Sequence, residues 1–572
     1  MIYFDKYKKK ILLIILSFIY LLILNYNLYI NKFNPILIIV WIASIILFIS
    51  PFINGVLSYF SRLRISKNTF VVTSVIFLPS IIRVLIILTL RRLWIHQDDM
   101  ISAYFSAKYD LTGTNFFGPL PLDKGDWVSQ FPAVYHFLQK IFFMIFGESL
   151  MSVKLSTIPY VIITSFFLYL TVKLLFNRRT AVVSLMLYAF FPISLYHETL
   201  GLHINASSAV FMLFCFFLVI YFRYKQKIYA VLTGIACAFN FLFYPSSYIA
   251  LPLMFILFFL DFLNQRKRYV VINLLLASFS FIFTVSPFLT YMYQAKNFYI
   301  TQRFDQVNLL MGEHSELKDR INKGENIIRV LGDNFIKSVK SMYVDGIGGH
   351  GGYDFGYLAF FEKISLLFFI FGVFFSLYSI KKKFELMMIF IIIFITFFSG
   401  VVLTDMPPAY QRLLIAVPFI IIVTSGLFYF LEYYFEKNNG RKRYWFRIFF
   451  TAFLLIVYSS NNYFYFLKSI EKEKERVEVK IGNFIAQNYP VRKIYIAAFR
   501  TFALNKTFYF FGKENMKKTY SDYHDELLAD FNPNEKYVYV LTYPDAFNDK
   551  FQEMDKNAKI INFSENFSLF VN

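Results

Sequence analysis

Two adjacent carboxylates, Asp98 and Asp99, stand where an apolar run gives way to a polar loop, in the segment RRLWIHQDDM. Charge is costly beside a lipid bilayer, so ionisable groups gathered at one membrane face need an explanation. Neighbouring carboxylates repel each other, and partial loss of water raises the pKa of at least one of them. Such a carboxylate can accept a proton from a hydroxyl group as a general base. The alternative is structural, because Asp is also a good helix N-cap.

Arginines occur close to the same membrane boundary. Arg412 precedes an apolar run in PPAYQRLLIAVP, and Arg91 and Arg92 stand shortly before the two carboxylates. A guanidinium group can bind phosphate oxygens through two parallel hydrogen bonds. The alternative is a helix-end residue whose charged group extends from the apolar region to water. For Arg412 the phosphate-binding and helix-end interpretations carry equal weight. For Arg91 and Arg92 the helix-end interpretation is favoured.

Histidines and cysteines offer little metal chemistry. A metal site could combine His96 with the carboxylates, or use His197 and His203, but no ligand spacing in the sequence is diagnostic. We therefore predict no metal ligands and no certain cofactor, with a divalent metal as an alternative. Cys215 and Cys237 both fall in apolar runs, which excludes a disulfide scaffold and a cysteine zinc site.

The composition indicates what kind of protein positions these groups. Hydrophobic residues make up 57% of the 572 and charged residues 17%, and the mean hydropathy is +0.51. Soluble chains contain about 25% charged residues, so a polytopic membrane protein is predicted. Apolar runs of about 20 residues predict about 13 spanning helices. They lie near 11–30, 36–56, 70–90, 150–173, 181–198, 206–222, 228–244, 247–261, 270–291, 362–380, 386–403, 413–434 and 446–466.

The net charge of +21 could indicate nucleic-acid binding, but its distribution argues against this. Lys and Arg cluster in alternate short connections, whereas the short connections between them carry only Lys32 and Arg412. Basic loops stay in the cytoplasm, so we expect a cell-membrane protein with a cytoplasmic N-terminus and no nucleic-acid partner. Counting 131–147 as a span would place later basic loops outside, so we predict an interfacial helix there. The first apolar run is expected to be an uncleaved anchor.

The fold class predicted is an all-α polytopic membrane protein with a small extracytoplasmic α/β domain. We divide it into an N-terminal pair of spans at 1–69, a transmembrane module at 70–466, and the α/β domain at 467–572. Two large outer loops interrupt the module, at 91–149 and 292–361. Strand-like runs in the last domain lie at 493–499, 507–511 and 537–543.

The first outer loop contains an ordered series of short motifs. They are Asp98-Asp99, Thr112-Gly113, Phe117-Gly118, Gly125-Asp126-Trp127, Pro132 and Phe146-Gly147. This order resembles the first outer loop of polyprenyl-phosphate-sugar-dependent glycosyltransferases of the GT-C superfamily. The similarity is to the family-39-like branch, which holds the protein mannosyltransferases and the aminoarabinose transferases. HETLGLHIN (197–205) and the Arg412 segment resemble later motifs of that branch, so the resemblance covers roughly 91–434.

The resemblance implies an inverting transfer of a hexose or pentose from a polyprenyl-phosphate carrier to an extracytoplasmic acceptor: a protein, a lipid or an envelope glycan. It makes Asp98 the general base, and Asp99 a catalytic partner that orients it or binds sugar. The implied substrate-binding residues are Asp126, Gln130, His203, Asn205 and Arg412.

The sequence also departs from the family pattern at three places. Asp99 stands where Glu is commoner, and Gln130-Phe131 stands where many relatives have a Lys-containing pair. The segment Tyr244-Pro245-Ser246 lacks an Arg that some relatives carry.

Two other classes of membrane protein stay open. An envelope-lipid transporter or flippase would place its ionisable groups near mid-membrane, often in two related halves. The sequence shows few charges within spans and no similarity between halves. A lipid-linked-glycan polymerase or ligase would also have large outer loops, but the motif order of the first loop disfavours it.

Overall fold

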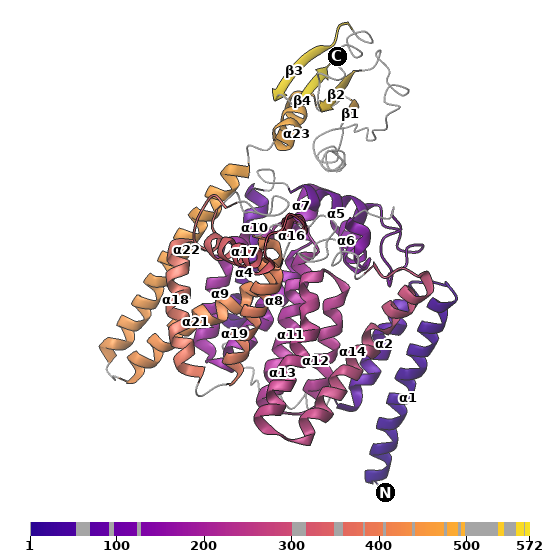
Figure 1. The fold of residues 1–572 in the computed structure, drawn as a ribbon, viewed down its shortest axis with the longest axis vertical. Helices are drawn as coiled ribbons and strands as arrows, with labels where there is room; N and C mark the ends of the chain where they lie inside the picture. Colours follow the sequence, from indigo (N-terminus) through magenta and orange to yellow (C-terminus); the bar gives the residue numbers. More distant parts are fainter. Residues whose placement is uncertain are drawn as a thin grey trace.

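The computed structural model describes most of the chain. The described residues are 2–52, 69–90, 96–122, 127–299, 316–347, 358–380, 384–403, 408–437, 441–473, 477–489, 493–497, 536–542, 556–564 and 567–571. Within these ranges the protein is a bundle of helices, with a small sheet beyond one end of it (Figure 1).

Helices occupy most of the described residues of the predicted spans. They are α1 (Ile2–Tyr29), α2 (Ile36–Ile49), α4 (Thr69–Leu90), α8 (Ile158–Leu175), α9 (Arg178–Ala189), α11 (Ile204–Tyr224), α12 (Lys227–Phe239), α13 (Ala250–Gln265), α14 (Arg268–Ala295), α18 (Lys363–Ile380), α19 (Phe384–Phe397), α21 (Val417–Lys437) and α22 (Arg441–Glu473).

The predicted number of spans is not confirmed. Among the described residues, six helices are long and apolar enough to cross a membrane. The predicted span at 181–198 is not one continuous helix, because α9 ends at Ala189 and Pro192 begins the short helix α10 (Pro192–His197). Proline has no backbone N–H and disrupts a helix that continues through it.

The helices at the centre of the bundle are buried around their whole circumference. Almost every residue of α11 is buried, and α11 packs against both α8 and α12. A Cβ on Gly234 of α12 would collide with the carbonyl oxygen of Ala277 on α14, so this glycine allows the two helices to approach closely. At the periphery, large apolar side chains of α1 such as Leu22 are exposed, as expected of a surface that faces lipid.

One end of the bundle carries short helices that lie across it (Figure 1). We call this end the rim; its helices are α5 (Gln97–Ala107), α6 (Val134–Phe146), α7 (Leu150–Leu155), α10, α16 (Glu316–Asn322) and α17 (Ile327–Ser341). The N-terminus and the basic α13–α14 turn lie at the opposite end. With 13 residues, α6 is about 20 Å long. The hydrocarbon core measures about 30 Å, so α6 is too short to span and agrees with an interfacial helix.

Beyond the rim, α23 (Val477–Asn488) covers a four-stranded sheet (Figure 1). The sheet order is β1-β2-β4-β3, with β1 parallel to β2 and the other pairs antiparallel. Strands β1 (Lys493–Ala497) and β2 (Tyr537–Thr542) coincide with predicted strands. The prediction missed β3 (Lys559–Ser564) and β4 (Phe567–Val571). The strand predicted at 507–511 lies outside the described residues, and a separate α/β domain stays a prediction.

Candidate active site

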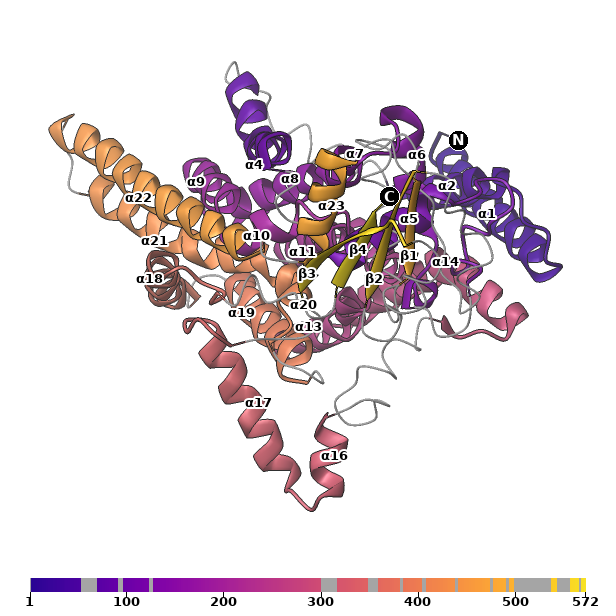
Figure 2. The same cartoon turned by 90° about the horizontal axis from the view of Figure 1, so that it is seen from above.

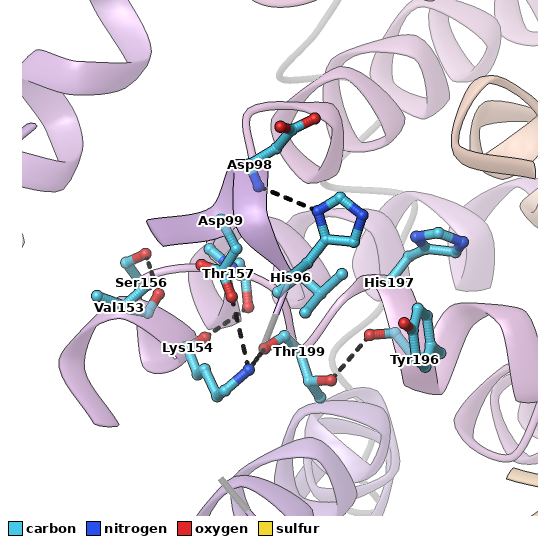
Figure 3. A network of polar contacts seen from close by, with 12 residues as sticks. His96, Asp98, Asp99, Val153, Lys154, Ser156, Thr157, Tyr196, His197 and Thr199 are labelled. Carbon is cyan, nitrogen blue, oxygen red and sulfur yellow. Dashed lines mark hydrogen bonds and ion pairs between the residues drawn. The ribbon is translucent and has the colours of Figure 1, made fainter. Parts of the chain in front are cut away.

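Helix α5 begins at the two carboxylates identified in the sequence. Its N-cap is His96, whose Nδ1 accepts a hydrogen bond of 3.1 Å from the backbone N–H of Asp98. The structural alternative expected an aspartate as the cap of this helix, but the cap is a histidine. Asp98 and Asp99 lie instead in the first turn, where the helix dipole favours negative charge. The Asp98 carboxylate is half-buried and points away from Asp99 (Figure 3).

Asp99 is fully buried and points into the protein. Its Oδ1 accepts a 3.0 Å hydrogen bond from the N–H of Gly201, and its Oδ2 lies 3.6 Å from Nζ of the buried Lys154. Lys154 also lies 3.5 Å from the carbonyl oxygen of Thr199 (Figure 3). Burial raises the pKa of Asp99, while the charge of Lys154 and the Gly201 hydrogen bond oppose that rise. We call these four residues the Asp99 network; it joins α5 to α7 and to the segment after α10.

Glycine is required at position 201 by close packing. A Cβ there would lie 2.5 Å from Cγ1 of Val153 and 2.8 Å from Oδ1 of Asp99. Any larger residue would displace either the α7 side chain or the carboxylate.

The segment 198–203 is fixed from its other side by a second buried ion pair. Nε of Arg83 donates to Glu198 at 2.7 Å, and the hydroxyl of Tyr188 donates to the same carboxylate at 2.5 Å. Arg83 also donates to Oγ of Ser194 at 2.7 Å. Because Glu198 directly precedes the Asp99 network in sequence, these contacts fix the backbone on which Thr199 and Gly201 lie.

Asn205 and Gln139 hold the same segment through their amide groups. Nδ2 of Asn205 donates to the carbonyl oxygens of His197 at 3.0 Å and Leu200 at 2.7 Å. Nε2 of Gln139, on α6, donates to the carbonyl oxygen of Gly201 at 3.4 Å. In this structure Asn205, predicted to bind substrate, therefore shapes the loop beside Asp99.

His203 lies in an aromatic cluster. Its ring centroid is 4.6 Å from that of Phe131, 4.8 Å from Tyr244 and 5.9 Å from Tyr135. Gln130, which precedes Phe131, is buried as well. The structure therefore brings the first-loop motif around Gln130 against the HETLGLHIN motif.

Arg412 lies on another short helix. It is 6% exposed, on α20 (Tyr410–Leu413), and the next turn, η8 (Leu414–Ala416), packs beside α10 and α11. The Asp99 network includes residues that follow α10, so the element after Arg412 and this network both adjoin α10. Asp126, Arg91 and Arg92 lie outside the described residues.

Lys154, Glu198 and Gly201 were missed as site residues in the sequence. The only available signals were a lone lysine inside a predicted span and an acidic residue inside the HETLGLHIN motif. For metal binding, the described part of the chain contains no group of three or more His, Cys, Asp or Glu side chains that could hold an ion.

Comparison with known proteins gives a family match over part of the chain and a similar fold. A family model described as dolichyl-phosphate-mannose-protein mannosyltransferase matches residues 130–291. ArnT from Cupriavidus metallidurans, solved bound to undecaprenyl phosphate, is similar with a TM-score of 0.51 and 11% identity, over 88% of this chain and 98% of that one. The archaeal oligosaccharyltransferase AglB from Archaeoglobus fulgidus has a TM-score of 0.47 and 13% identity, over 79% of this chain and 65% of that one. No curated protein matches the sequence.

These findings confirm the family resemblance that the first outer loop indicated, and with the apolar helices they identify a multi-pass membrane protein. The matched residues include Gln130, His203 and Asn205 but neither Asp98 nor Arg412. At 11% identity the likeness to ArnT shows the fold alone.

Proposed function

We propose that this GT-C-type membrane protein transfers a sugar from a polyprenyl-phosphate carrier to a hydroxyl group of an extracytoplasmic acceptor, with inversion at the anomeric carbon. The observation that carries the proposal is the different placement of two adjacent carboxylates at the rim. Asp99 is fully buried against Lys154, whereas Asp98 is half-buried and points away from that pair. Asp99 therefore makes its contacts inside the protein, and we assign the proton-accepting role to Asp98, whose carboxylate points in another direction (Figure 3).

The chemistry is a single displacement. The acceptor oxygen bonds to the anomeric carbon while the bond from that carbon to the phosphate oxygen breaks. Asp98 takes the hydroxyl proton as general base, and the carrier leaves as a polyprenyl phosphate. Because one displacement attacks from the face opposite the leaving group, the configuration inverts. Arg412 binds the phosphate as its negative charge develops.

The remaining residues bind and position the substrates. Asp99 fixes the first turn of α5 and thereby the direction of Asp98. In this proposal the sugar lies beside His203 and Gln130, and Asn205 keeps the adjoining loop in shape. Asp126 binds the sugar or the acceptor from the first loop.

The rim faces the extracytoplasmic side in this proposal. Basic turns such as α13–α14 lie at the opposite end of the bundle (Figure 1), where the positive-inside rule puts the cytoplasm. The carrier's chain would lie in lipid, with its sugar and phosphate at the level of α5 and α6.

The test uses purified protein in lipid nanodiscs with a pool of polyprenyl-phosphate-linked radiolabelled sugars and a cell-envelope extract as acceptor. The proposal predicts label in a lipid-free or new lipid product, with release of polyprenyl phosphate and an inverted anomeric signal by NMR. Movement of the lipid-linked sugar across vesicle membranes with no new glycosidic bond would instead establish a flippase. Transfer from a pyrophosphate-linked oligosaccharide alone would establish a polymerase or ligase.

A further inference from the structure

Helices α16 and α17 form a braced hairpin at the rim. The backbone turns at Gly324, which has φ +90°, and Oδ1 of Asn326 accepts the N–H of Ile328 at 2.8 Å to begin α17. Arg320 on α16 donates to Glu325 at 2.9 and 2.6 Å and to Asp333 on α17 at 2.7 Å. These contacts fix the angle between the two helices, so the hairpin has a defined surface.

The hairpin projects sideways from the bundle (Figure 2). One face of α17 packs on the protein through Val330, Ser338 and Ser341, which are buried. Asn334 reaches the carbonyl oxygen of Val402 at 3.4 Å, in the π-helix η7 (Phe398–Val402) that contacts α17. The rest of α17 therefore lies beyond the edge of the bundle (Figure 2).

The unpacked part of α17 has two different faces. Ile328 and Phe335, two helical turns apart, are 76% and 43% exposed, and Ile336 is 52% exposed. Lys337 and Lys340 lie on the other face. They border an open groove of about 570 Å³, lined by Asp333, Ile336, Lys337, Lys340, Gly346 and Ile347. The carboxylate of this groove already pairs with Arg320.

We propose that α17 lies in the plane of the outer membrane interface and binds an anionic phospholipid. Ile328 and Phe335 enter the acyl-chain boundary, and Lys337 and Lys340 bind the headgroup phosphate in the groove. An apolar stripe beside a basic stripe is typical of helices that lie in this plane. Anionic lipid is the occupant that matches both stripes, because its phosphate pairs with the lysines while its chains cover the exposed apolar side chains.

The test measures depth and headgroup preference in nanodiscs of the full-length protein. The native cysteines are both buried, so a bimane label can be directed to Ile328→Cys or to its neighbour on the basic side, Arg329→Cys. Phosphatidylcholine spin-labelled near the headgroup is expected to quench the label at 328 at least about two-fold more strongly than at 329. Equal quenching at both positions, or ready quenching of the label at 328 by aqueous iodide, would overturn the proposal.

Headgroup preference is tested in the Ile328→Cys protein. Spin-labelled phosphatidylglycerol should quench more strongly than spin-labelled phosphatidylcholine at the same mole fraction. Lys337→Gln with Lys340→Gln should remove that preference, by about five-fold in apparent affinity per lysine, while quenching by phosphatidylcholine persists. That persistence shows that the helix is still folded and seated. Equal quenching by the two lipids in the parent protein would contradict the phosphate site.

Discussion

Replacing Lys154 by Met tests whether the Asp99 network supports the site. The change removes the cation 3.6 Å from the Asp99 carboxylate in a place where both side chains are fully buried. With an effective dielectric constant of about 20, a pair at this distance interacts with about 4 to 5 kcal/mol. Breaking a buried pair by removing one partner costs about 3–5 kcal/mol in proteins. We expect Lys154→Met to lower the free energy of unfolding by about 4 kcal/mol at neutral pH.

The matched control combines Lys154→Met with Asp99→Asn. The double variant has no buried charge left, so it should recover about 2–3 kcal/mol of the loss as a coupling energy. Unfolding of the purified protein in mixed micelles, by rising fractions of SDS and followed by circular dichroism, measures the two single variants, Lys154→Met and Asp99→Asn, and the double variant. If the losses in unfolding free energy of the two single variants simply add in the double variant, the two charges are not coupled, and the reasoning is refuted.

The loss of stability in the single variant Lys154→Met should depend on pH. Burial already holds the pKa of Asp99 above its ordinary value, and loss of the Lys154 charge raises it further. For an acid whose folded pKa is raised, stability is full below the unfolded pKa and is lost as the pH rises through the folded pKa. The deficit of Lys154→Met should therefore be largest at neutral pH and shrink on acidification. A deficit independent of pH would mean that the lysine acts only through packing.

Three further substitutions test other parts of the site. Gly201→Ala should cost about 1–3 kcal/mol in the same unfolding assay, because its methyl group would press on Asp99. The control Gly332→Ala, in open space on a helix, should be neutral or stabilising. Equal effects of the two substitutions would contradict the packing argument. Glu198→Gln leaves its arginine partner buried with reduced compensation and should cost about 3–5 kcal/mol, so near-native stability would show that the pair is dispensable. Arg412→Gln should weaken binding of polyprenyl phosphate about ten-fold or more by native mass spectrometry, with Arg412→Lys in between, and unchanged binding would remove Arg412 from the phosphate site.

The sequence predicted the helical membrane fold because hydrophobic runs and basic turns are local signals. It did not predict that the span at 181–198 breaks, since proline near a span end is compatible with either outcome. It also could not give the span count, because apolar helices of 10–17 residues such as Lys227–Leu242 occur among the longer ones.

The sequence identified some of the residues that form the candidate site, whose roles stay predictions. The carboxylate pair and the HETLGLHIN segment were found in the sequence, and the structure joins them through Asp99 and Gly201. Their partners were not found, because Lys154 is 55 positions from Asp99 and Arg83 is 115 positions from Glu198. Only tertiary packing brings such residues together, and a lone charge in an apolar run gives no indication of which distant group it meets.

The most direct test of the central claim is the rate of sugar transfer by Asp98→Asn, measured at saturating lipid-linked donor. The control is Asp110→Asn, which removes an exposed carboxylate from the same outer loop. Loss of a general base should lower kcat by about 10²- to 10⁴-fold. Polyprenyl phosphate binding should be unchanged, and the control should keep its full rate. Near-normal turnover by a correctly inserted Asp98→Asn protein would contradict the account.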